Sequence, residues 1–348
     1  MPLKNNFNIP LDKFIDKALY DKKIGYYMKK EPFGKDGDFI TAPNLSRLFS
    51  EMIAIWIIGF WENLGSPKNF NLVELGAGNG SMMKILIETF KKFPHFFNSC
   101  NIIIHEKSSK LIKIQKKKLI QKKVIWVSDI KKIKTIPTIF VANEFFDSIA
   151  IKQFIKIDNL WFEKYVNIKK KERPYFLNKK IDIKKFEKKI GYDISKNQNF
   201  IEYSLLSVEY LKKIAHNIKK SNGGLLIIDY GYFERKMKNT LKAISNHKYT
   251  NILKNVGKSD ITYNINFYLF KKIIKRFGGL KNIMTTQGDF LVKMGIKKRA
   301  EIISKNKNFS EKKDIYFRLK RLIDENHMGN IFKVMFVKKQ KNNFKMGF

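Results

Sequence analysis

The sequence predicts an α/β fold in which helices cover both faces of a mostly parallel sheet. Short apolar runs alternate with helical stretches between about residues 69 and 150, and the alternation returns after residue 222. These runs are continuously apolar, which is typical of parallel strands that are buried on both sides. Such an alternation of strands and helices builds an open sheet.

The expected elements of the first half follow one another in a regular order. Residues 1–68 suit an N-terminal helical region around a Gly/Pro-rich loop, Glu31–Pro43. The core begins at residue 69 and runs to residue 150. Its expected strands and helices are, in order, "NLVELG", Met82–Phe90, "NIIIHE", Leu111–Leu119, "VIWVSD" and "TIFVANEF".

The second half begins with a change of pattern. Residues 151–221 contain "IKQFIKI" and "LWFEKYVNI", which suit a hairpin, and then lysine-rich helical sequence, so we expect an insertion. The core resumes over residues 222–340 with "GGLLIIDYG", a helix at Phe267–Phe277 and two late strands near Ile283–Phe290 and Ile331–Val337. The chain has no internal repeats.

The composition limits the class of protein. With 348 residues, 44% of them hydrophobic, the chain can bury a sizeable core. Cys100 is the single cysteine, which excludes an internal disulfide and suits a reducing compartment. It also excludes a zinc site rich in cysteine, and no metal site is expected.

The formal net charge of +39 invites a nucleic-acid interpretation. However, the excess is spread along the whole chain, and the abundant residue types Lys, Asn, Ile and Phe have codons rich in A and T. The lysine runs Lys116–Lys118 and Lys169–Lys171 favour solvated faces over phosphate contacts. We therefore expect no specific nucleic-acid partner.

No stretch of the sequence suits a membrane span or a targeting peptide. The most apolar stretch, Ile53–Trp61, lies between Glu51 and Glu62 and is shorter than the roughly 20 residues that a span needs. The N-terminus has neither an apolar signal core nor an Arg-rich transit pattern. We expect a cytoplasmic bacterial protein.

The segment "VELGAGNGSM", Val73–Met82, places Gly76, Gly78 and Gly80 directly after a strand. Such a turn needs glycine where φ is positive or where the backbone approaches a ligand closely, although an ordinary tight turn is the alternative. A dinucleotide fingerprint would have its third glycine at Ser81, and the Gly-Lys-Ser/Thr of a P-loop is absent. The G-x-G-x-G form with Glu74 before it is found in S-adenosyl-L-methionine (SAM) methyltransferases.

Two acids at strand ends extend this site. Glu106 ends "NIIIHE", and ligands of open α/β sheets lie at the carboxyl ends of the strands. An acid there can accept hydrogen bonds from both ribose hydroxyls, whereas a solvated acid is the alternative. Asp129 ends "VIWVSD" and is placed to reach the adenine amino group, but it is equally suited to capping a helix.

The chain resembles the MidA family of SAM-dependent methyltransferases over nearly its whole length. Seven segments carry the resemblance in order: "GYYMKKEPFGKDGDFITAP", "VELGAGNGSMM", "ANEFFDSIAIKQF", "LLIIDYGY", "NHKY", "TTQGDFLVKMGIKKRA" and "HMGNIFKV". The resemblance implies a class I (Rossmann-like) methyltransferase with a mostly parallel seven-stranded sheet and SAM as cofactor. Mitochondrial members of the family assist complex I assembly and methylate an arginine of a complex I subunit, so a protein substrate is expected.

The chain departs from the family pattern at several positions. The glycine loop has Ala77 and Asn79 where the family usually has Pro-x-Arg chemistry, and Asn44 stands where an acid usually follows "TAP". Acids and a histidine are also usual where the chain has Asn251, Asn264 and Asn266. These departures affect the inferred identity of the substrate more than the expectation of a SAM site.

The segment "NEFFD" supplies a candidate acid pair, Glu144 and Asp147. Residues i and i+3 of a turn or first helical turn can point the same way. Two carboxylates facing a guanidinium can fix its fork and localise its charge. Capping of the following helix is the alternative.

The remaining candidates are less sharply defined. Asp229 in "IIDYG" is a third candidate acid, and His247 could relay a proton, with an ordinary surface or core histidine as the alternative. Asn143, beside Glu144, is a candidate cofactor-binding residue. Residues 37–43 suit either a lid that brings Thr41 near the ligand or a structured N-terminal wrap.

Three classes of function remain open on these observations. The first is a protein-arginine methyltransferase acting on a respiratory-chain subunit. The second is a nucleic-acid methyltransferase, although "ANEFFD" occupies the place of the usual Asn/Asp-Pro-Pro-Tyr motif. The third is a non-catalytic assembly factor that retains the fold. The sequence does not indicate an oligomeric state.

Overall fold

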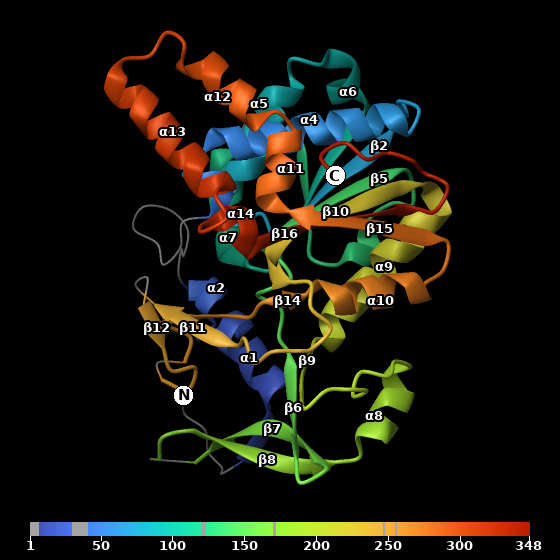
Figure 1. Ribbon diagram of the computed structural model, residues 1–348, viewed down its shortest axis with the longest axis vertical. Coiled ribbons are helices and arrows are strands. Elements are labelled where there is room, and N and C mark those ends of the chain that lie inside the picture. Colours follow the sequence, from blue (N-terminus) through green and yellow to red (C-terminus); the bar gives the residue numbers. More distant parts are fainter. Residues whose placement is uncertain (1–6, 30–40, 120–122, 170–171, 246–247, 255) are drawn as a thin grey trace.

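A mixed sheet occupies the upper half of the molecule in Figure 1. The computed structural model describes residues 7–29, 41–119, 123–169, 172–245, 248–254 and 256–348. Seven strands follow the order β15-β16-β10-β5-β2-β3-β4, and β14 (Ile265–Asn266) adds a short parallel pairing to β10. Their bounds are β2 (Phe70–Leu75), β3 (Cys100–His105), β4 (Val124–Val127), β5 (Thr138–Asn143), β10 (Gly223–Tyr232), β15 (Leu280–Thr286) and β16 (Phe332–Lys339).

The predicted parallel sheet is confirmed, with one reversed strand. The pairs from β10 to β4 are parallel, while β16 runs antiparallel to both β10 and β15. The carboxyl ends of β2, β3, β5 and β10 therefore meet at one edge. This edge carries the glycine turn and the candidate acids.

Successive strand residues enter two different hydrophobic cores. In β2, Leu72 belongs to one core and Val73 to the other, because side chains alternate across a sheet. Both faces are thus buried, which explains the continuous apolar runs. One face packs against α4 (Arg47–Asn63), α5 (Ser81–Phe90), α11 (Gln287–Lys293) and α12 (Ile296–Ser304), and the other against α9 (Leu205–Ser221) and α10 (Phe267–Arg276).

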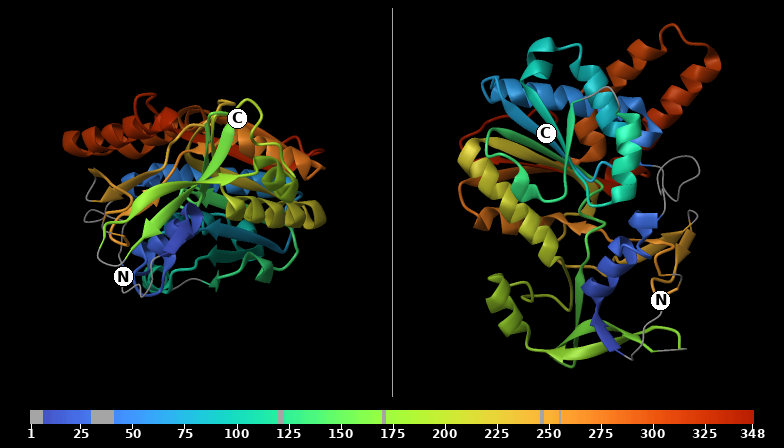
Figure 2. Two further views of the ribbon diagram at one scale, coloured as in Figure 1. Left: turned by 90° about the horizontal axis from the view of Figure 1, so that it is seen from below. Right: turned by 180° about the vertical axis from the view of Figure 1, so that it is seen from behind.

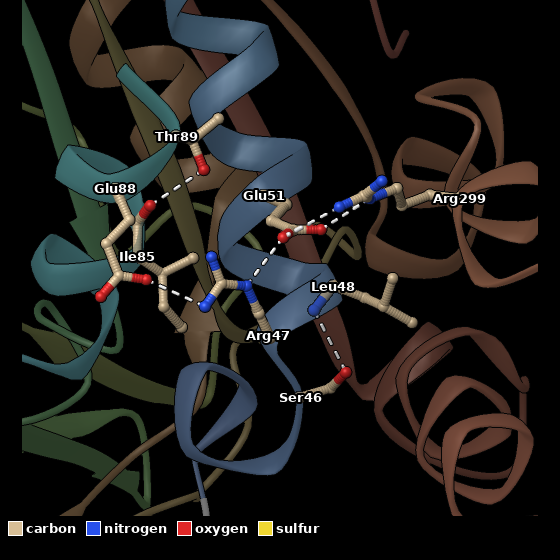
Figure 3. A network of polar contacts seen from close by, with 8 residues as sticks. All are labelled: Ser46, Arg47, Leu48, Glu51, Ile85, Glu88, Thr89 and Arg299. Carbon is tan, nitrogen blue, oxygen red and sulfur yellow. Dashed lines mark hydrogen bonds and ion pairs between the residues drawn. The ribbon is translucent and has the colours of Figure 1, made fainter. Parts of the chain in front are cut away.

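A polar network fixes α12 against α4 (Figure 3). The Oε2 atom of Glu51 accepts a hydrogen bond from Nε of Arg299 at 2.8 Å, and Oε1 accepts one from Nε of Arg47 at 2.8 Å. Arg47 also reaches Glu88 on α5 at 2.9 Å. Burial alone would raise the pKa of Glu51, but the two arginines outweigh it and lower the pKa.

The predicted insertion contains a hairpin within a five-stranded sheet. The strands β6 (Lys152–Ile157) and β7 (Leu160–Ile168) pair antiparallel as expected, and β9 (Phe200–Tyr203) joins β6. Two expectations were wrong. The strand β8 (Tyr175–Ile181) lies before α8 (Ile183–Ile190), in lysine-rich sequence that was predicted to be helical. This segment is a strand because its pairing with β7 outweighs the low strand propensity of lysine. The strand β1 (Phe7–Pro10) from the N-terminal region also pairs with β7, so that region is not purely helical.

The helix α9 lies within the predicted insertion but contacts β5, β10 and β16 of the main sheet. We therefore propose that the core resumes at α9 rather than at residue 222. The prediction of a strand near Ile283–Phe290 was also partly wrong. The strand β15 ends at Thr286, whose hydroxyl caps α11 by accepting from the Asp289 N–H at 3.2 Å, so the apolar residues that follow are helical.

The helix α1 and the three-stranded sheet that contains β11 and β12 lie below the main sheet in Figure 1. The sheet order is β12-β11-β13, and α1 lies beside it. The helices α12 and α13 form a hairpin that projects from the body (Figure 2). The bounds are α1 (Leu11–Tyr20), α2 (Tyr26–Lys29), α3 (Ala42–Leu45), β11 (Lys242–Ser245), β12 (Lys248–Thr250) and β13 (Asp260–Thr262). The other elements are α6 (Pro94–Ser99), α7 (Ser109–Lys118), η1 (Ile130–Lys132), α13 (Phe309–Ile323) and α14 (Met328–Ile331).

Within the described ranges, no helix combines the length and the apolar character that crossing a membrane requires.

Candidate active site

The glycine turn between β2 and α5 has the backbone conformation that its sequence predicts. The φ angle is 67° at Gly76, 52° at Gly78 and 78° at Gly80, a region that residues with a Cβ rarely adopt. A Cβ on Gly76 would also lie 2.8 Å from Cδ2 of Phe145. The turn therefore requires glycine for its conformation, and at Gly76 also for space.

Glu106 follows β3, and three donors fix its carboxylate. The backbone N–H groups of Lys107 and Ser108 donate to Oε1 at 2.9 Å each, and Nε2 of Gln115 donates to Oε2 at 3.2 Å. The same Gln115 amide donates to the carbonyl oxygen of Gly78 at 2.8 Å. Buried Gln115 thus ties the strand-end acid to the glycine turn, a role that the sequence analysis missed.

Two pockets meet at the glycine turn, with volumes of about 640 Å³ and 370 Å³, both open to solvent. Gly76, Gly78 and Glu144 line both of them. The larger is also lined by Asp16, Tyr20, Tyr27, His105, Glu106, Lys107, Leu111, Phe145, Ser148, Ile149, Ala150, Leu206 and Tyr210. The smaller is also lined by Thr41, Pro43, Asn44, Glu74, Ala77, Asn79, Ser81, Met82 and Asn143.

The smaller pocket has polar atoms suited to a ligand. Glu74 is only 3% exposed, and its Oε2 has no hydrogen-bond partner in the described part of the chain. Burial and the nearby charge of Glu106 raise the pKa of Glu74 to about 8. The Oδ1 of Asn143 is likewise buried without a described partner. Buried polar atoms of this kind are normally satisfied, so both atoms mark places where a polar ligand group fits.

Glu144 lies where the two pockets join. Its backbone takes a left-handed φ of 49°, and its N–H donates to the carbonyl oxygen of Ile228 at 2.9 Å. Its carboxylate accepts from Nδ2 of Asn143 at 3.2 Å and from the backbone N–H of Ala42 on α3. Burial, and next the charge of Asp147, raise the pKa of Glu144 to about 8.

Asp147 lies behind Glu144 rather than in the wall of either pocket. It is 7% exposed, and its Oδ2 accepts from the Thr262 hydroxyl at 2.8 Å. Burial raises the pKa of Asp147 to about 6, although the Thr262 hydroxyl and the charge of Lys242 oppose the rise. No lysine or arginine of the described residues forms an ion pair with Glu144 or Asp147.

Asp229, the third candidate acid, has a different position from the one expected. It is fully buried and lines neither pocket. Its Oδ2 accepts from the N–H groups of Phe146 and Asp147 at 3.0 and 3.3 Å, and its Oδ1 from that of Tyr230 at 2.9 Å. Asp229 thus holds the turn that carries Glu144 and has no position in the wall of either pocket.

Two other predicted residues are not brought to the pockets. Asp129 accepts from the Lys131 N–H at 2.9 Å and caps η1, which favours the capping alternative over the adenine contact. Gly80 begins α5 beside Gln115 without lining a pocket. His247 and residues 37–40 lie outside the described residues, whereas Thr41 borders the smaller pocket.

The larger pocket has an aromatic wall that the sequence analysis missed. Tyr20 and Tyr27 of the N-terminal helices stack with ring centroids 5.5 Å apart, and Tyr210 comes from α9. Tyr210 also contacts His105, whose Nε2 lies 2.9 Å from the phenol oxygen. These residues are far apart in the sequence, and no local pattern indicates that they meet.

Two of the departures from the family pattern lie against each other. Nδ2 of Asn79 donates to Oδ1 of Asn44 at 3.4 Å, and Nδ2 of Asn44 donates to the Thr41 hydroxyl at 3.0 Å. This neutral pair links the segment after residue 40 to the glycine turn. Asn266 instead caps α10, accepting from the Leu269 N–H at 2.8 Å.

The residues around the two pockets fit SAM. The turn has the backbone conformations of glycine and no phosphate-binding lysine. The carboxylate of Glu106 at a strand end can accept hydrogen bonds from a diol. Buried oxygens of Glu74 and Asn143 have no described hydrogen-bond partner. The fold and site define a class I SAM-dependent methyltransferase. A family model described as an S-adenosyl-L-methionine-dependent methyltransferase matches residues 52–285, and the chain belongs to that family.

Similar proteins agree with this assignment. The chain is 28% identical over 366 residues to "Protein arginine methyltransferase NDUFAF7, mitochondrial" of Xenopus tropicalis. This alignment covers 95% of the chain and 82% of the relative. It is 30% identical over 304 residues to the Caenorhabditis elegans homologue, covering 79% and 70%. A crystal structure of a Burkholderia thailandensis protein bound to S-adenosyl-homocysteine has the same fold, with a TM-score of 0.83, 20% identity, and coverage of 98% and 90%. The predicted fold class and SAM dependence are confirmed.

Proposed function

We propose that the protein is an arginine N-methyltransferase whose client is another protein, namely a subunit of respiratory complex I. The names of the relatives support arginine in a protein as the methylated group, and the resemblance of the seven segments supports a complex I subunit as the client. The observation that carries the proposal is an acid pair of which Glu144 lies at the junction of the pockets and Asp147 lies behind it. Asp147 is buried and Glu144 is partly buried, and neither has a described ion-pair partner in a chain of net charge +39.

An acid pair of this kind suits a guanidinium. The arginine side chain stays protonated because its pKa exceeds about 12, so it needs local negative charge. Glu144 faces the pockets and accepts the client's N–H groups, while Asp147, one layer behind, adds a second charge. The arrangement differs from a two-carboxylate clamp, because Glu144 alone lines the pockets.

The chain's residues hold and orient the reactants. Bound SAM supplies an electrophilic methyl group on a sulfonium, and displacement on it requires a nucleophile in line with the S–CH₃ bond. Positioning therefore provides most of the rate enhancement. Asp229 fixes the turn of Glu144 by accepting from the amides of Phe146 and Asp147. The strain of the left-handed backbone conformation at Glu144 is tolerated because these hydrogen bonds fix the turn.

We assign the cofactor contacts to residues around both pockets. Glu106 takes the ribose, Gly76 and Gly78 the close backbone approach, and Glu74 with Asn143 the polar groups of the methionine part. Thr41 closes the smaller pocket from α3. The lining of the pockets and the unsatisfied oxygens support this assignment.

We also propose that the protein acts in a bacterial cytoplasm. Its single cysteine suits that reducing compartment, whereas the named relatives are mitochondrial.

Incubation of the protein with a cell lysate and methyl-labelled SAM tests the proposed function. We expect labelled bands that survive RNase, disappear with protease, and yield methylarginine on hydrolysis. Label that RNase removes would support a nucleic-acid substrate. No label from protein that binds SAM would support a non-catalytic assembly factor.

A further inference from the structure

Lys242 on β11 lies beside the acid pair although it is distant in sequence. It is the register partner of Thr262 on the antiparallel strand β13. Residues directly opposite in such a pair project to the same side of the sheet. The Thr262 hydroxyl donates to Oδ2 of Asp147 at 2.8 Å, so Lys242 is on the side of the sheet that faces this carboxylate.

The ammonium group of Lys242 lies between two aromatic rings. Its Nζ is 5.5 Å from the ring centroid of Tyr230 and 5.8 Å from that of Tyr249. Cations are attracted to ring faces at such distances. Tyr249 is 77% exposed, so this cage of two rings opens to solvent on one side. The charge of Lys242 also lowers the pKa of Asp147 against the effect of burial.

We infer that Lys242 is a positioning residue, the resident counter-cation that keeps negative charge on the Glu144–Asp147 pair until the client's cationic side chain arrives. The inference rests on the proposed function and identifies a residue that sets the strength of client binding. Lys242 does not form an ion pair with Asp147 within the described part of the chain, so the carboxylate is stabilised without being blocked.

Lys242 favours a negative charge on Asp147, whereas most of the other ionisable groups near Asp147 disfavour it. Glu144 from the same turn and Asp229 from β10 are acids coupled to it, and the phenols of Tyr27, Tyr230 and Tyr263 lie within range of its charge. Each acid disfavours a negative charge on Asp147. Lys242, in contrast, is a cation whose charge lowers the pKa of Asp147.

Replacement of Lys242 has an effect that depends on pH. In Lys242→Met, Asp147 holds its proton to higher pH, so fewer molecules carry the charge that attracts the client near pH 6.5. Near pH 9 most molecules of both proteins carry the ionised pair, and the variant lacks the repulsion between Lys242 and the client. We expect kcat/KM for an arginine peptide to fall about 3-fold to 10-fold near pH 6.5 and to equal or exceed the wild-type value near pH 9.

The test measures kcat/KM from pH 6 to 9 for the wild type, Lys242→Met, Lys242→Arg and Lys248→Met. Lys242→Arg keeps the charge and should follow the wild-type profile. Lys248→Met removes an exposed lysine from the neighbouring strand and should also follow it. Parallel profiles for Lys242→Met and the wild type, or a Lys242→Arg profile like that of Lys242→Met, would overturn the inference.

A second measurement separates this inference from the proposed function. Carboxyl-carbon NMR of the SAM-free protein follows the titration of Asp147 directly, and we expect its pKa to be higher in Lys242→Met. An unchanged Asp147 pKa overturns the inference, whether or not the protein methylates arginine. A wild-type protein that binds SAM but never methylates the peptide contradicts the proposed function alone.

Discussion

Glu144 is held in a backbone conformation that non-glycine residues rarely take, with φ at 49°. Strain of this kind costs on the order of 1–3 kcal/mol and persists only where neighbouring bonds fix it. Here the Glu144 N–H is bound by Ile228, and the next amides along the turn by Asp229. The strain places one carboxylate at the junction of both pockets.

The raised pKa of Glu144 predicts how client binding depends on pH. With a pKa of about 8, Glu144 is mostly protonated at neutral pH in the free protein, and its ionised fraction grows as pH rises. The affinity for an arginine peptide should therefore increase between pH 6.5 and 8.5, by about 10-fold. Calorimetry of peptide binding across this range checks it. In Glu144→Gln the increase should disappear, and a wild-type affinity that falls with pH would contradict the assignment.

Gly78 offers a test of the cofactor turn. Gly78→Ala adds a Cβ at a left-handed φ of 52°, which costs about 1–2 kcal/mol, and it lies in the wall of both pockets. We expect SAM affinity to fall at least about 10-fold by calorimetry. Gly65→Ala is the matched control, since Gly65 has a φ of 86° with no atom near its Cβ position and lies away from the pockets. Equal losses of SAM affinity in both variants would mean that backbone strain alone causes the loss, and that Gly78 has no special place at the cofactor.

The sequence identifies some site residues because their signal is local. Gly76, Gly78 and Glu106 lie at strand ends where the spacing of residues is itself informative. Tyr27, Gln115 and Lys242 have no such signal, because each reaches the site through contacts between elements that are distant along the chain. Asp129 shows the limit of the local signal, since a strand-end acid suits a ligand and a helix cap equally.

At the scale of elements, the attachment of α12 to α4 depends on one buried acid, Glu51 (Figure 3). Glu51→Gln removes the charge that Arg47 and Arg299 share, and should lower the free energy of unfolding by about 1–2 kcal/mol near pH 7. The folded-state pKa of Glu51 is lowered, so this stabilisation is present above its unfolded pKa and is lost as pH falls through the folded value. Thermal unfolding should show a larger difference between the two proteins at pH 7 than at pH 3.

The control for this variant is Glu301→Gln, which breaks an exposed pair with Lys298 and should have little effect. A Glu51→Gln protein as stable as the wild type at pH 7 would show that the network contributes nothing to the attachment of α12.

Elements were predictable where their periodicity is strong. The core strands and α5, α7 and α10 were expected close to their observed bounds, because buried apolar runs and helical spacing decide them locally. The strand β8 was missed because its lysine-rich sequence gains its conformation from pairing with β7. The start of α11 was missed because a single cap, Thr286, ends the apolar strand.

At the scale of the whole molecule, the site is enclosed by segments outside the SAM core. The N-terminal helices supply Tyr20 and Tyr27, and the three-stranded sheet supplies Lys242 and Thr262. Residues of the predicted N-terminal region thus line the larger pocket.

The net charge gives a prediction about nucleic acid. If the lysine excess reflects codon composition, DNA binding should be non-specific, with a Kd weaker than about 1 µM at physiological salt, and should weaken steeply as salt increases. Fluorescence anisotropy with DNA of several sequences at 50 and 200 mM salt measures this. Tight binding to one sequence at physiological salt would instead support a nucleic-acid substrate.

The most direct test of the arginine-methyltransferase proposal pairs methyl transfer with SAM binding in Glu144→Gln. The account predicts that transfer to an arginine peptide falls roughly 30-fold to 150-fold, equivalent to about 2–3 kcal/mol, because a charged hydrogen bond to the client is lost. SAM affinity measured by calorimetry on the same samples should stay within about 3-fold of the wild type, since the proposed ribose contact is made by Glu106. Glu88→Gln, which changes a partly exposed acid on α5 outside both pockets, should leave both quantities unchanged. Wild-type transfer by Glu144→Gln, or a loss of SAM affinity that matches the loss of transfer, would contradict the account.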